Sequence, residues 1–290
     1  MDFWGSAGQL DRCEHQRADP VWLAAQWAAP GASLLVVDSK GRVGVNGDGL
    51  TIAARPPAGE FDEQQHYLLG LVAGRPMFVE AGEIEAGAGL RELMPALDDA
   101  FRELVVAAVA LVQWHLTSPH CGLCGASTVV TTGGMVRHCP GCGRDRFPRS
   151  DPAIIVAVLD ADDRLLLGHQ SVWAPGRMSI LAGFVTAGES LEQAVHREVA
   201  EETGLALSGV RYVASQPWPF PRSLMLGFVA RAVGTDITVD EVEIEYARWF
   251  TRDELTAAVD AGEVGLPGEA SIAHRLIADW RAGTLAPVSG

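Results

Sequence analysis

The chain has 290 residues, of which 48% are apolar and 20% charged, a composition typical of a globular protein with about two domains. Its formal net charge of −15, from 22 basic and 37 acidic residues, argues against a surface that grips a long polyphosphate backbone. The longest uninterrupted apolar run, Leu104–Val112, is far shorter than the roughly twenty residues that a membrane helix needs. The first residues lack the apolar core of a signal peptide, so we expect a cytoplasmic protein with no membrane partner.

A first domain is expected over residues 1–118. Apolar stretches on either side of Ser39–Arg42 and of Ala73–Pro76 predict two β-hairpins, and apolar residues recur at helical spacing from Ala96 to Leu116. Nothing in this domain carries recognisable chemistry. Three of its side chains are interpreted as surface or packing residues: Cys13, His66 and Arg75.

Four cysteines follow within residues 119–149, as Cys121-Gly-Leu-Cys124 and Cys139-Pro-Gly-Cys142. Two CxxC pairs, each with a Gly that allows a tight turn, have the spacing of a zinc ribbon with four thiolate ligands. Two disulfides are the alternative, which a reducing compartment disfavours. A closed site of four cysteines leaves no position for water, so a Zn²⁺ ion here is expected to be structural. Cys13 then has no partner and is expected to be a free thiol.

Four arginines lie around the second cysteine pair of this acidic protein: Arg137, Arg144, Arg146 and Arg149. They could receive a phosphate or an RNA end, or they could pair with the excess carboxylates of the chain. The sequence leaves both interpretations open.

Strands and helices are expected to alternate through a second domain, residues 150–290. Buried strands are predicted on either side of a turn at Ala161–Asp163, and another is predicted at Met178–Ala182. The later elements are three strands and a closing helix, at Val210–Ala214, Ser223–Ala230, Glu245–Phe250 and Ile272–Arg281.

One more helix is predicted from about Leu191 to about Thr203. Ser190 and Gln193 form a capping-box pattern before it, and Gly204 stands where a left-handed C-cap residue is expected. Both ends of this helix are therefore legible in the sequence.

Three glutamates share one face of this helix, because Glu198, Glu201 and Glu202 stand at i, i+3 and i+4. Like charges so close together destabilise a bare helix. A Mg²⁺ or Mn²⁺ ion between them would relieve the repulsion, and such ions commonly bridge protein carboxylates to substrate phosphates. The alternative is a solvated acidic face, which is what most Glu-rich helices present.

A second informative stretch reads SQPWPFPRS, from Ser215 to Ser223. Its alternating prolines exclude a central strand and predict an extended, semi-rigid loop. That stiffness would hold Trp218 and Phe220 as platforms, although prolines and aromatic residues could also pack a corner of the core.

The segment from Gly183 to Leu205 is similar to the Nudix box of nucleoside-diphosphate-linked hydrolases at every fixed position. The cysteine pairs, this box and the SQPWPFPRS stretch together resemble the NADH pyrophosphatase, or NudC-type, family over about residues 119–281. The resemblance implies an α/β protein: a Nudix α/β/α sandwich preceded by a Nudix-like N-terminal α+β domain and a four-cysteine zinc ribbon. It also implies a homodimer that cleaves the diphosphate of NAD(H) to nicotinamide mononucleotide and AMP with Mg²⁺ or Mn²⁺, and that removes NAD caps from RNA 5′ ends.

The resemblance assigns metal ligands and catalytic groups. The ligands would be the carbonyl of Ala182 and the carboxylates of Glu198, Glu202 and Glu243, with Glu201 acting through water. The base that deprotonates the attacking water would be Glu202, with Glu201 second, since either lies within reach of a water at the metal.

The resemblance also assigns an ion pair between Arg197 and Glu189 that orients the helix. Phe147 and Phe184 would sandwich the adenine, whereas Gly133-Gly134 stands where the family can carry an acidic contact. The remaining expected contacts with the dinucleotide are Gln216, Pro217, Trp218, Pro219, Phe220, Pro221, Arg222, Ser223 and Ala273.

Two alternative functions compete with this one. A module that senses NAD or ADP-ribose without hydrolysing it would be expected to lack a box glutamate, and none is missing. An enzyme that acts mainly on NAD-capped RNA would use the same residues. The acidic balance argues against broad RNA contact, whereas the arginines around Cys142 could hold a few nucleotides.

Overall fold

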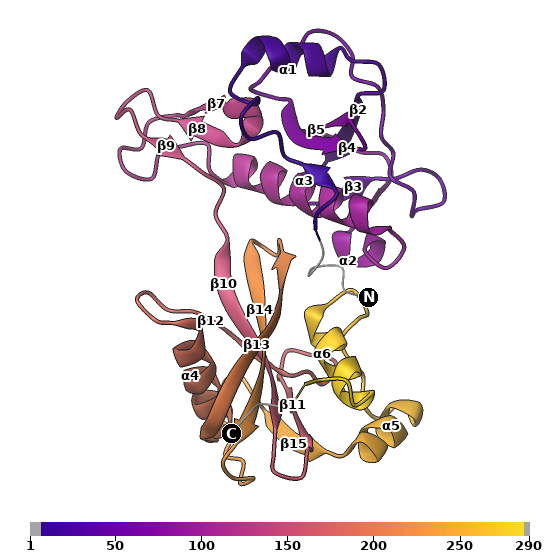
Figure 1. Cartoon of the computed structure of the whole chain (residues 1–290), viewed down its shortest axis with the longest axis vertical. Helices are drawn as coiled ribbons and strands as arrows, with labels where there is room; N and C mark the ends of the chain where they lie inside the picture. Colours follow the sequence, from indigo (N-terminus) through magenta and orange to yellow (C-terminus); the bar gives the residue numbers. More distant parts are fainter. Residues whose placement is uncertain (1–6, 287–290) are drawn as a thin grey trace. The chain divides into compact units, whose positions relative to one another are not determined.

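Residues 7–286 are described in the computed structural model, and they fall into two units (Figure 1). Of the described residues, the first unit contains 7–149 together with Pro219–Arg222. The second contains Ser150–Trp218 and residues 223–286. The four cysteines therefore cluster with the N-terminal segment.

The first unit is built on a six-stranded sheet with the order β1-β4-β5-β2-β3-β6. Both predicted hairpins are present, as the antiparallel pairs β2–β3 and β4–β5, while β2 and β5 run parallel. The strands are Leu10–Asp11 (β1), Ser33–Val37 (β2), Val43–Gly44 (β3), Tyr67–Val72 (β4), Arg75–Ala81 (β5) and Gly87–Ala88 (β6).

Three helices accompany this sheet: Pro20–Trp27 (α1), Leu90–Leu93 (α2) and Asp99–Thr117 (α3). The predicted long helix is confirmed as α3, which starts later than expected because Asp98 caps it by accepting a hydrogen bond from Phe101 N. Among the described residues α3 alone is long and apolar enough to cross a membrane. However, 56% of its 18-residue window is buried inside the protein, as in a core helix.

A small three-stranded sheet holds the cysteine-containing segment. Its strands, in the order β7-β8-β9, are Val129–Thr131, Val136–His138 and Asp145–Arg146, with a 3₁₀ turn at Thr132–Gly134 (η2). This sheet was not foreseen, because its strands are too short to show a periodic pattern.

The second unit is a mixed sheet with the order β13-β14-β10-β11-β15, to which β12 adds by pairing with β10. Its strands are Asp151–Leu159 (β10), Leu165–His169 (β11), Leu181–Phe184 (β12), Leu207–Trp218 (β13), Ser223–Ala232 (β14) and Tyr246–Phe250 (β15). The helices are Leu191–Thr203 (α4), Arg252–Asp260 (α5) and Ile272–Arg281 (α6).

Helices cover both faces of this sheet. Ala194, Val195 and Val199 of α4 pack on one face, and Leu255 of α5 with Trp280 of α6 pack on the other. Alternate residues of β10 point into the two cores, as the period of a strand buried on both faces requires. The expected α/β/α sandwich is confirmed.

The prediction of a loop over the SQPWPFPRS stretch is only partly right. Residues 215–218 continue β13, with Gln216 opposite Met225 and Trp218 opposite Ser223. Pro217, the one proline of this stretch that lies in β13, is tolerated because β13 is an edge strand, where one side of the backbone needs no ladder hydrogen bonds. Only Pro219–Arg222 forms the turn into β14.

The two units repeat one strand arrangement. In the first the order β4-β5-β2-β3-β6 includes a parallel β2–β5 pair, and in the second β13-β14-β10-β11-β15 includes a parallel β10–β14 pair. The hairpin after each central strand is closed in the same way, since Asp38 binds Arg42 and Asp160 binds Arg164 through backbone and side chain. No helix lies between β3 and β4, where the second unit carries α4. The first unit thus has the Nudix-like strand order without the box helix.

Candidate active site

The helix α4 begins and ends where the sequence predicted. The Ser190 side chain accepts from Gln193 N, and the Gln193 side chain accepts from Ser190 N, which completes the capping box. Gly204 ends the helix in the left-handed conformation, with φ at 70°. The helix is therefore fixed at both ends by local sequence, which places its glutamates independently of a ligand.

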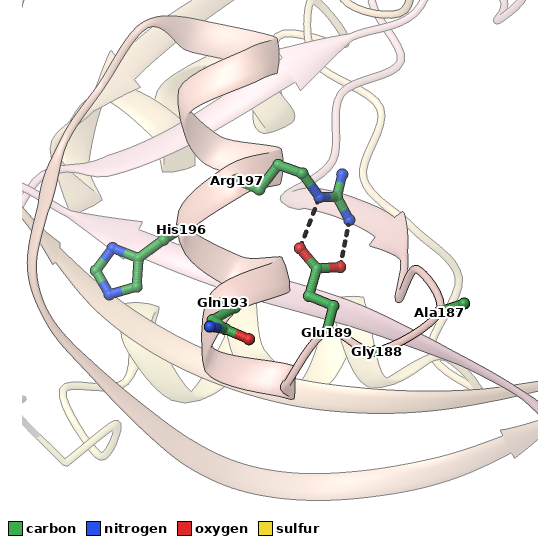
Figure 2. Close-up of a pocket in the computed structure, with 6 residues that line it drawn as sticks. All are labelled: Ala187, Gly188, Glu189, Gln193, His196 and Arg197. Carbon is green, nitrogen blue, oxygen red and sulfur yellow. Dashed lines mark hydrogen bonds and ion pairs between the residues drawn. The ribbon is translucent and has the colours of Figure 1, made fainter.

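Arg197 joins α4 to the turn that precedes it. Its guanidinium donates to both carboxylate oxygens of Glu189, at 2.7 and 2.8 Å (Figure 2), and to the Phe184 carbonyl oxygen at 3.0 Å. This fork holds the pKa of Glu189 at about 2, with help from the backbone N–H of Thr186. The predicted ion pair is confirmed, and it ties the end of β12 to the middle of α4.

The same guanidinium also reaches two box glutamates. It lies 2.9 Å from a carboxylate oxygen of Glu198 and 2.9 Å from one of Glu201. Three negative charges thus surround one cation, which raises the pKa of Arg197 far above its ordinary value. Glu201 is exposed, so its pair contributes little to stability.

Gly183 lets Glu198 lie directly against β12. A Cβ atom at this position would stand 1.9 Å from the carboxyl carbon of Glu198, so no larger residue fits while Glu198 keeps its place. Glu198 is buried, and burial raises its pKa despite the nearby Arg197. The glycine of the box is therefore required by a close approach.

Glu202 is the most anomalous group of the site. Only 2% of the residue is exposed, and neither carboxylate oxygen has a hydrogen-bond partner among the described residues. Burial, followed by the charges of Glu198, Glu243 and Asp240, raises the pKa of Glu202 to about 8. A buried carboxylate without a donor requires a proton or a cation. Oxygen ligands of this kind fit Mg²⁺ or Mn²⁺.

The other expected ligands are not drawn together by the chain alone. Glu243 lies on an exposed loop where the Asp240 carboxylate accepts from the N–H groups of Glu243 and Ile244, and Ala182 lies in β12 opposite Ile155. Within residues 7–286, only the four cysteines form a group of three or more side chains close enough to hold an ion. The folded chain therefore positions the expected ligands of α4 and β12, whereas the Glu243 carboxylate is not held beside them.

The residues expected to bind the dinucleotide divide into exposed and covered ones. Phe147 in the first unit is 60% exposed and Phe184 in the second is 57% exposed, so each offers a ring for stacking. Gln216 is buried, and its amide bonds the Ala270 carbonyl oxygen and Ile272 N, which holds the start of α6 beside buried Ala273. In this position the Gln216 side chain stabilises the contact between β13 and the start of α6.

An open hollow lies beside the first turns of α4 and includes the Glu189–Arg197 pair (Figure 2). It is lined by Ala187, Gly188, Glu189, Gln193, His196 and Arg197. None of the expected metal ligands lines it, so it is not the catalytic centre itself.

The cysteine site has the geometry of a zinc centre. Its four sulfur atoms lie within 4.8 Å of one another, with Cys121–Cys142 at 3.7 Å and Cys124–Cys139 at 3.4 Å. Zinc–sulfur bonds of about 2.3 Å in a tetrahedron separate sulfurs by about 3.8 Å, whereas a disulfide needs about 2 Å. Backbone N–H groups of Cys124 and Leu123 lower the pKa of Cys121 to about 6, which favours the thiolate that binds zinc.

The four arginines of this segment do not act as one basic group. Arg137 is buried: it donates to the Thr128 hydroxyl at 2.7 Å and to His115 Nδ1 at 2.9 Å. The interpretation of Arg137 as a phosphate ligand or a carboxylate partner is therefore wrong. Arg144 and Arg149 are exposed, and no carboxylate of residues 7–286 forms an ion pair with either.

The sandwich, the box helix and the zinc ribbon together define a Nudix-class protein with an accessory zinc module. Comparison with family models agrees, because a NUDIX domain matches residues 149–266 and an NADH pyrophosphatase zinc ribbon domain matches residues 116–147. The chain belongs to the NudC-type family of Nudix hydrolases, as its similarity to full-length members demonstrates.

Three relatives illustrate that similarity. NAD-capped RNA hydrolase NudC of Mycobacterium bovis is 41% identical over 94% of this chain and 92% of its own length. The protein of that name from Chromobacterium violaceum is 41% identical over 78% of this chain and 84% of its own length. NAD-capped RNA hydrolase NUDT12 of Homo sapiens is 42% identical, but covers 61% of this chain and 41% of its own length.

Proposed function

We propose that this protein hydrolyses the diphosphate bond of NAD(H) to nicotinamide mononucleotide and AMP, and removes NAD caps from RNA 5′ ends. The observation that carries the proposal is Glu202, a buried carboxylate without a hydrogen-bond donor among the described residues, on an intact Nudix helix. The names of the relatives, NAD-capped RNA hydrolases, support the choice of substrate.

The reaction needs a water molecule positioned in line with one phosphorus and a base to take its proton. Mg²⁺ or Mn²⁺, when bound, would offset charge on the phosphate oxygens and lower the pKa of the water. Glu202 would accept the proton at a carboxylate oxygen, which the lack of a donor within residues 7–286 leaves free. Glu198 would hold the ion from the Gly183 side, while Arg197 fixes α4 by its fork to Glu189.

The proposal includes a choice of ions, an assembly and a compartment. Mg²⁺ or Mn²⁺ is preferred because the donors are carboxylates and carbonyls, and Zn²⁺ belongs in the thiolate site. The homodimer is what the family resemblance implies, and the cytoplasmic location without a membrane partner is the expectation of the sequence analysis. Light scattering after gel filtration would check the assembly.

The first test is a competition assay with Mn²⁺, in which one enzyme sample meets equimolar NADH and a short RNA with a 5′ NAD cap. Hydrolysis of either at the diphosphate supports the proposal, and the ratio of the two kcat/KM values ranks the substrates. Hydrolysis of neither would contradict it and favour a module that only binds NAD.

A further inference from the structure

A patch of aromatic and basic side chains lies on the second unit, outside the residues that the proposed reaction uses. Its members come from the end of β11, the loop that follows and the start of β15: His169, Trp173, Arg177 and Tyr246. We call these four residues the aromatic–arginine patch. β11 and β15 are neighbours in the sheet, with His169 directly opposite Tyr246.

The buried base of the patch is His169, which is only 4% exposed. Its Nδ1 lies 2.7 Å from the carbonyl oxygen of Arg177, so this nitrogen carries a proton and donates it there. Tyr246 stacks on the imidazole with ring centroids 4.7 Å apart and planes at 21°. Trp173 meets the same imidazole edge-on, at 6.3 Å and 84°. The two outer rings are therefore held in fixed orientations.

The outer side of the patch is open to a ligand. Tyr246 is 41% exposed although one face of its ring covers His169, so the other face is available. The guanidinium carbon of Arg177 lies 5.5 Å from the centroid of the Trp173 ring. Arg177 is exposed, and no carboxylate of residues 7–286 forms an ion pair with it, which is unusual in a chain of net charge −15.

The patch adjoins the candidate active site through the loop at 240–245. The carboxylate of Glu243 acts electrostatically on Glu198 and Glu202 of α4, so this loop faces the box helix. Two residues later, a carboxylate oxygen of Glu245 lies 3.6 Å from His169 Nε2, and Tyr246 follows at once. The patch therefore follows directly, in sequence and through this contact, on the loop that carries Glu243.

The open face of Tyr246, beside the half-buried Trp173 and a cation without an acidic partner, is an arrangement that suits single-stranded nucleic acid, since a base can stack on the open ring and the cation can take a phosphate. We propose that the aromatic–arginine patch binds the first nucleotides of RNA that follow an NAD cap. The inference rests on the proposed function, because it places the capped end at α4. Free NAD(H) has no such nucleotides, so the patch would contribute to the binding of capped RNA and not to the binding of free NAD(H).

Three variants test the patch in the full-length zinc-containing enzyme: Trp173→Ala, Arg177→Ala and Tyr246→Ala. Each should keep kcat/KM for NADH within about twofold, and lose about tenfold for an NAD-capped RNA of roughly six nucleotides, in line with the loss of one stacked base or phosphate contact. Tyr246→Phe keeps the ring and should restore capped-RNA hydrolysis. Val172→Ala, an exposed neighbour without a ring, is the matched control and should change neither substrate.

A binding measurement separates failure of the patch from failure of the proposed reaction. Fluorescence anisotropy of a 5′-monophosphate RNA of the same length, without Mg²⁺ or Mn²⁺, should show weaker binding in all three variants. Arg177→Ala should also reduce the slope of log affinity against log salt by about 0.7. An enzyme that binds this RNA through the patch but hydrolyses no dinucleotide would refute only the proposed function. Three results would overturn the proposal that the patch binds RNA. They are unchanged RNA binding in the variants, no RNA binding by the parent enzyme, and equal losses of kcat/KM for NADH and for capped RNA.

Discussion

Glu202 is held in a state that the folded chain alone does not stabilise. Its two oxygens have no donor within residues 7–286, and burial together with neighbouring carboxylates raises its pKa to about 8. Such a group weakens the fold when it is ionised, yet it has a high affinity for a proton or a divalent ion. A destabilising group of this kind is expected at a position where the residue is required for binding rather than for stability.

Glu202→Gln replaces the carboxylate of Glu202 with a neutral amide. The amide keeps the shape but cannot accept a proton, so kcat should fall by about 10²- to 10⁴-fold, the usual contribution of a general base. Steady-state hydrolysis of NADH with Mn²⁺ measures it. Glu192→Gln, an exposed glutamate in the first turn of α4, is the control and should retain activity. If Glu202→Gln retained most of the activity, Glu202 could not be the general base.

The same variant should have the opposite effect on metal-free stability. At pH 9 with a chelator, the parent protein carries an ionised Glu202 in a buried place, whereas the amide is neutral. Glu202→Gln should therefore melt at a higher temperature than the parent. Addition of Mg²⁺ should raise the melting temperature of the parent more than that of the variant. Differential scanning fluorimetry is sufficient. A lower melting temperature for the metal-free variant would show that the carboxylate is stabilised by a partner.

Gly183→Ala tests the close approach between β12 and α4. The added Cβ would overlap the carboxyl group of Glu198, so Glu198 must move and the affinity for Mn²⁺ should fall by about 10- to 100-fold, as for other disturbed metal ligands. Titration of activity with Mn²⁺ measures it. Gly234→Ala, where a Cβ meets nothing within 4 Å, is the matched control. Equal Mn²⁺ dependence in both variants would contradict the assignment of Glu198.

At the scale of elements, the zinc ribbon is joined to α3 by a buried hydrogen-bond network. His115 Nε2 lies 2.8 Å from the Gly134 carbonyl oxygen and must donate to it, so Nδ1 accepts from Arg137. The Tyr67 ring stacks on the imidazole at 3.9 Å. Burial lowers the pKa of His115 to about 4, so this histidine is neutral at physiological pH.

A pH dependence follows with a definite sign. Because the folded pKa of about 4 lies below the ordinary 6.5, the contribution of neutral His115 to stability is complete above pH 6.5 and is lost as the pH falls towards 4. The loss has an upper bound of about 3 kcal/mol. Urea unfolding between pH 7 and pH 4.5 with excess zinc should show a smaller decline for His115→Gln than for the parent. Parallel declines would mean that other groups, such as released zinc thiolates, dominate.

Elements with local signals were predictable, and those fixed by tertiary contacts were not. The box helix α4 carries its own caps, which is why its bounds agree with the sequence. The edge position of β13 depends on which strands pair, so its continuation to Trp218 was not foreseen. The helices α1 and α5 were missed although Asp19-Pro20 and the Thr251–Glu254 capping box mark their starts.

Site residues follow the same division. Helical spacing alone places Glu198, Glu201 and Glu202 on one face, whereas their assignment as metal ligands rests on the resemblance to the Nudix box. The burial of Arg137 against His115 joins positions 22 residues apart in different elements, and no local pattern indicates it. The aromatic–arginine patch likewise depends on the pairing of β11 with β15, which the sequence does not reveal.

In the whole molecule, the two units share the same strand order but contain different functional elements. The second has the box helix, whereas the first has none between β3 and β4 and instead includes the zinc ribbon. Hydrogen bonds of His115 of α3 with Arg137 and with the Gly134 carbonyl oxygen attach the ribbon to the rest of the first unit, and the four cysteines would hold the ends of the ribbon together through zinc. Loss of zinc should therefore act on the first unit before it acts on the chemistry of the second.

Calorimetry with a thiol-reactive zinc chelator tests this division. Structural zinc contributes on the order of 10 kcal/mol to small ribbons, so the melting temperature of the first unit should fall by roughly ten degrees or more, while a second transition stays in place. NADH hydrolysis, assayed after Mg²⁺ is restored, should persist below the first transition. Cys13→Ser is the control, because the chelating reagent must not act through this buried free thiol. An unchanged melt would exclude a structural ribbon, and a joint shift of both transitions would show that zinc stabilises both units as one cooperative structure.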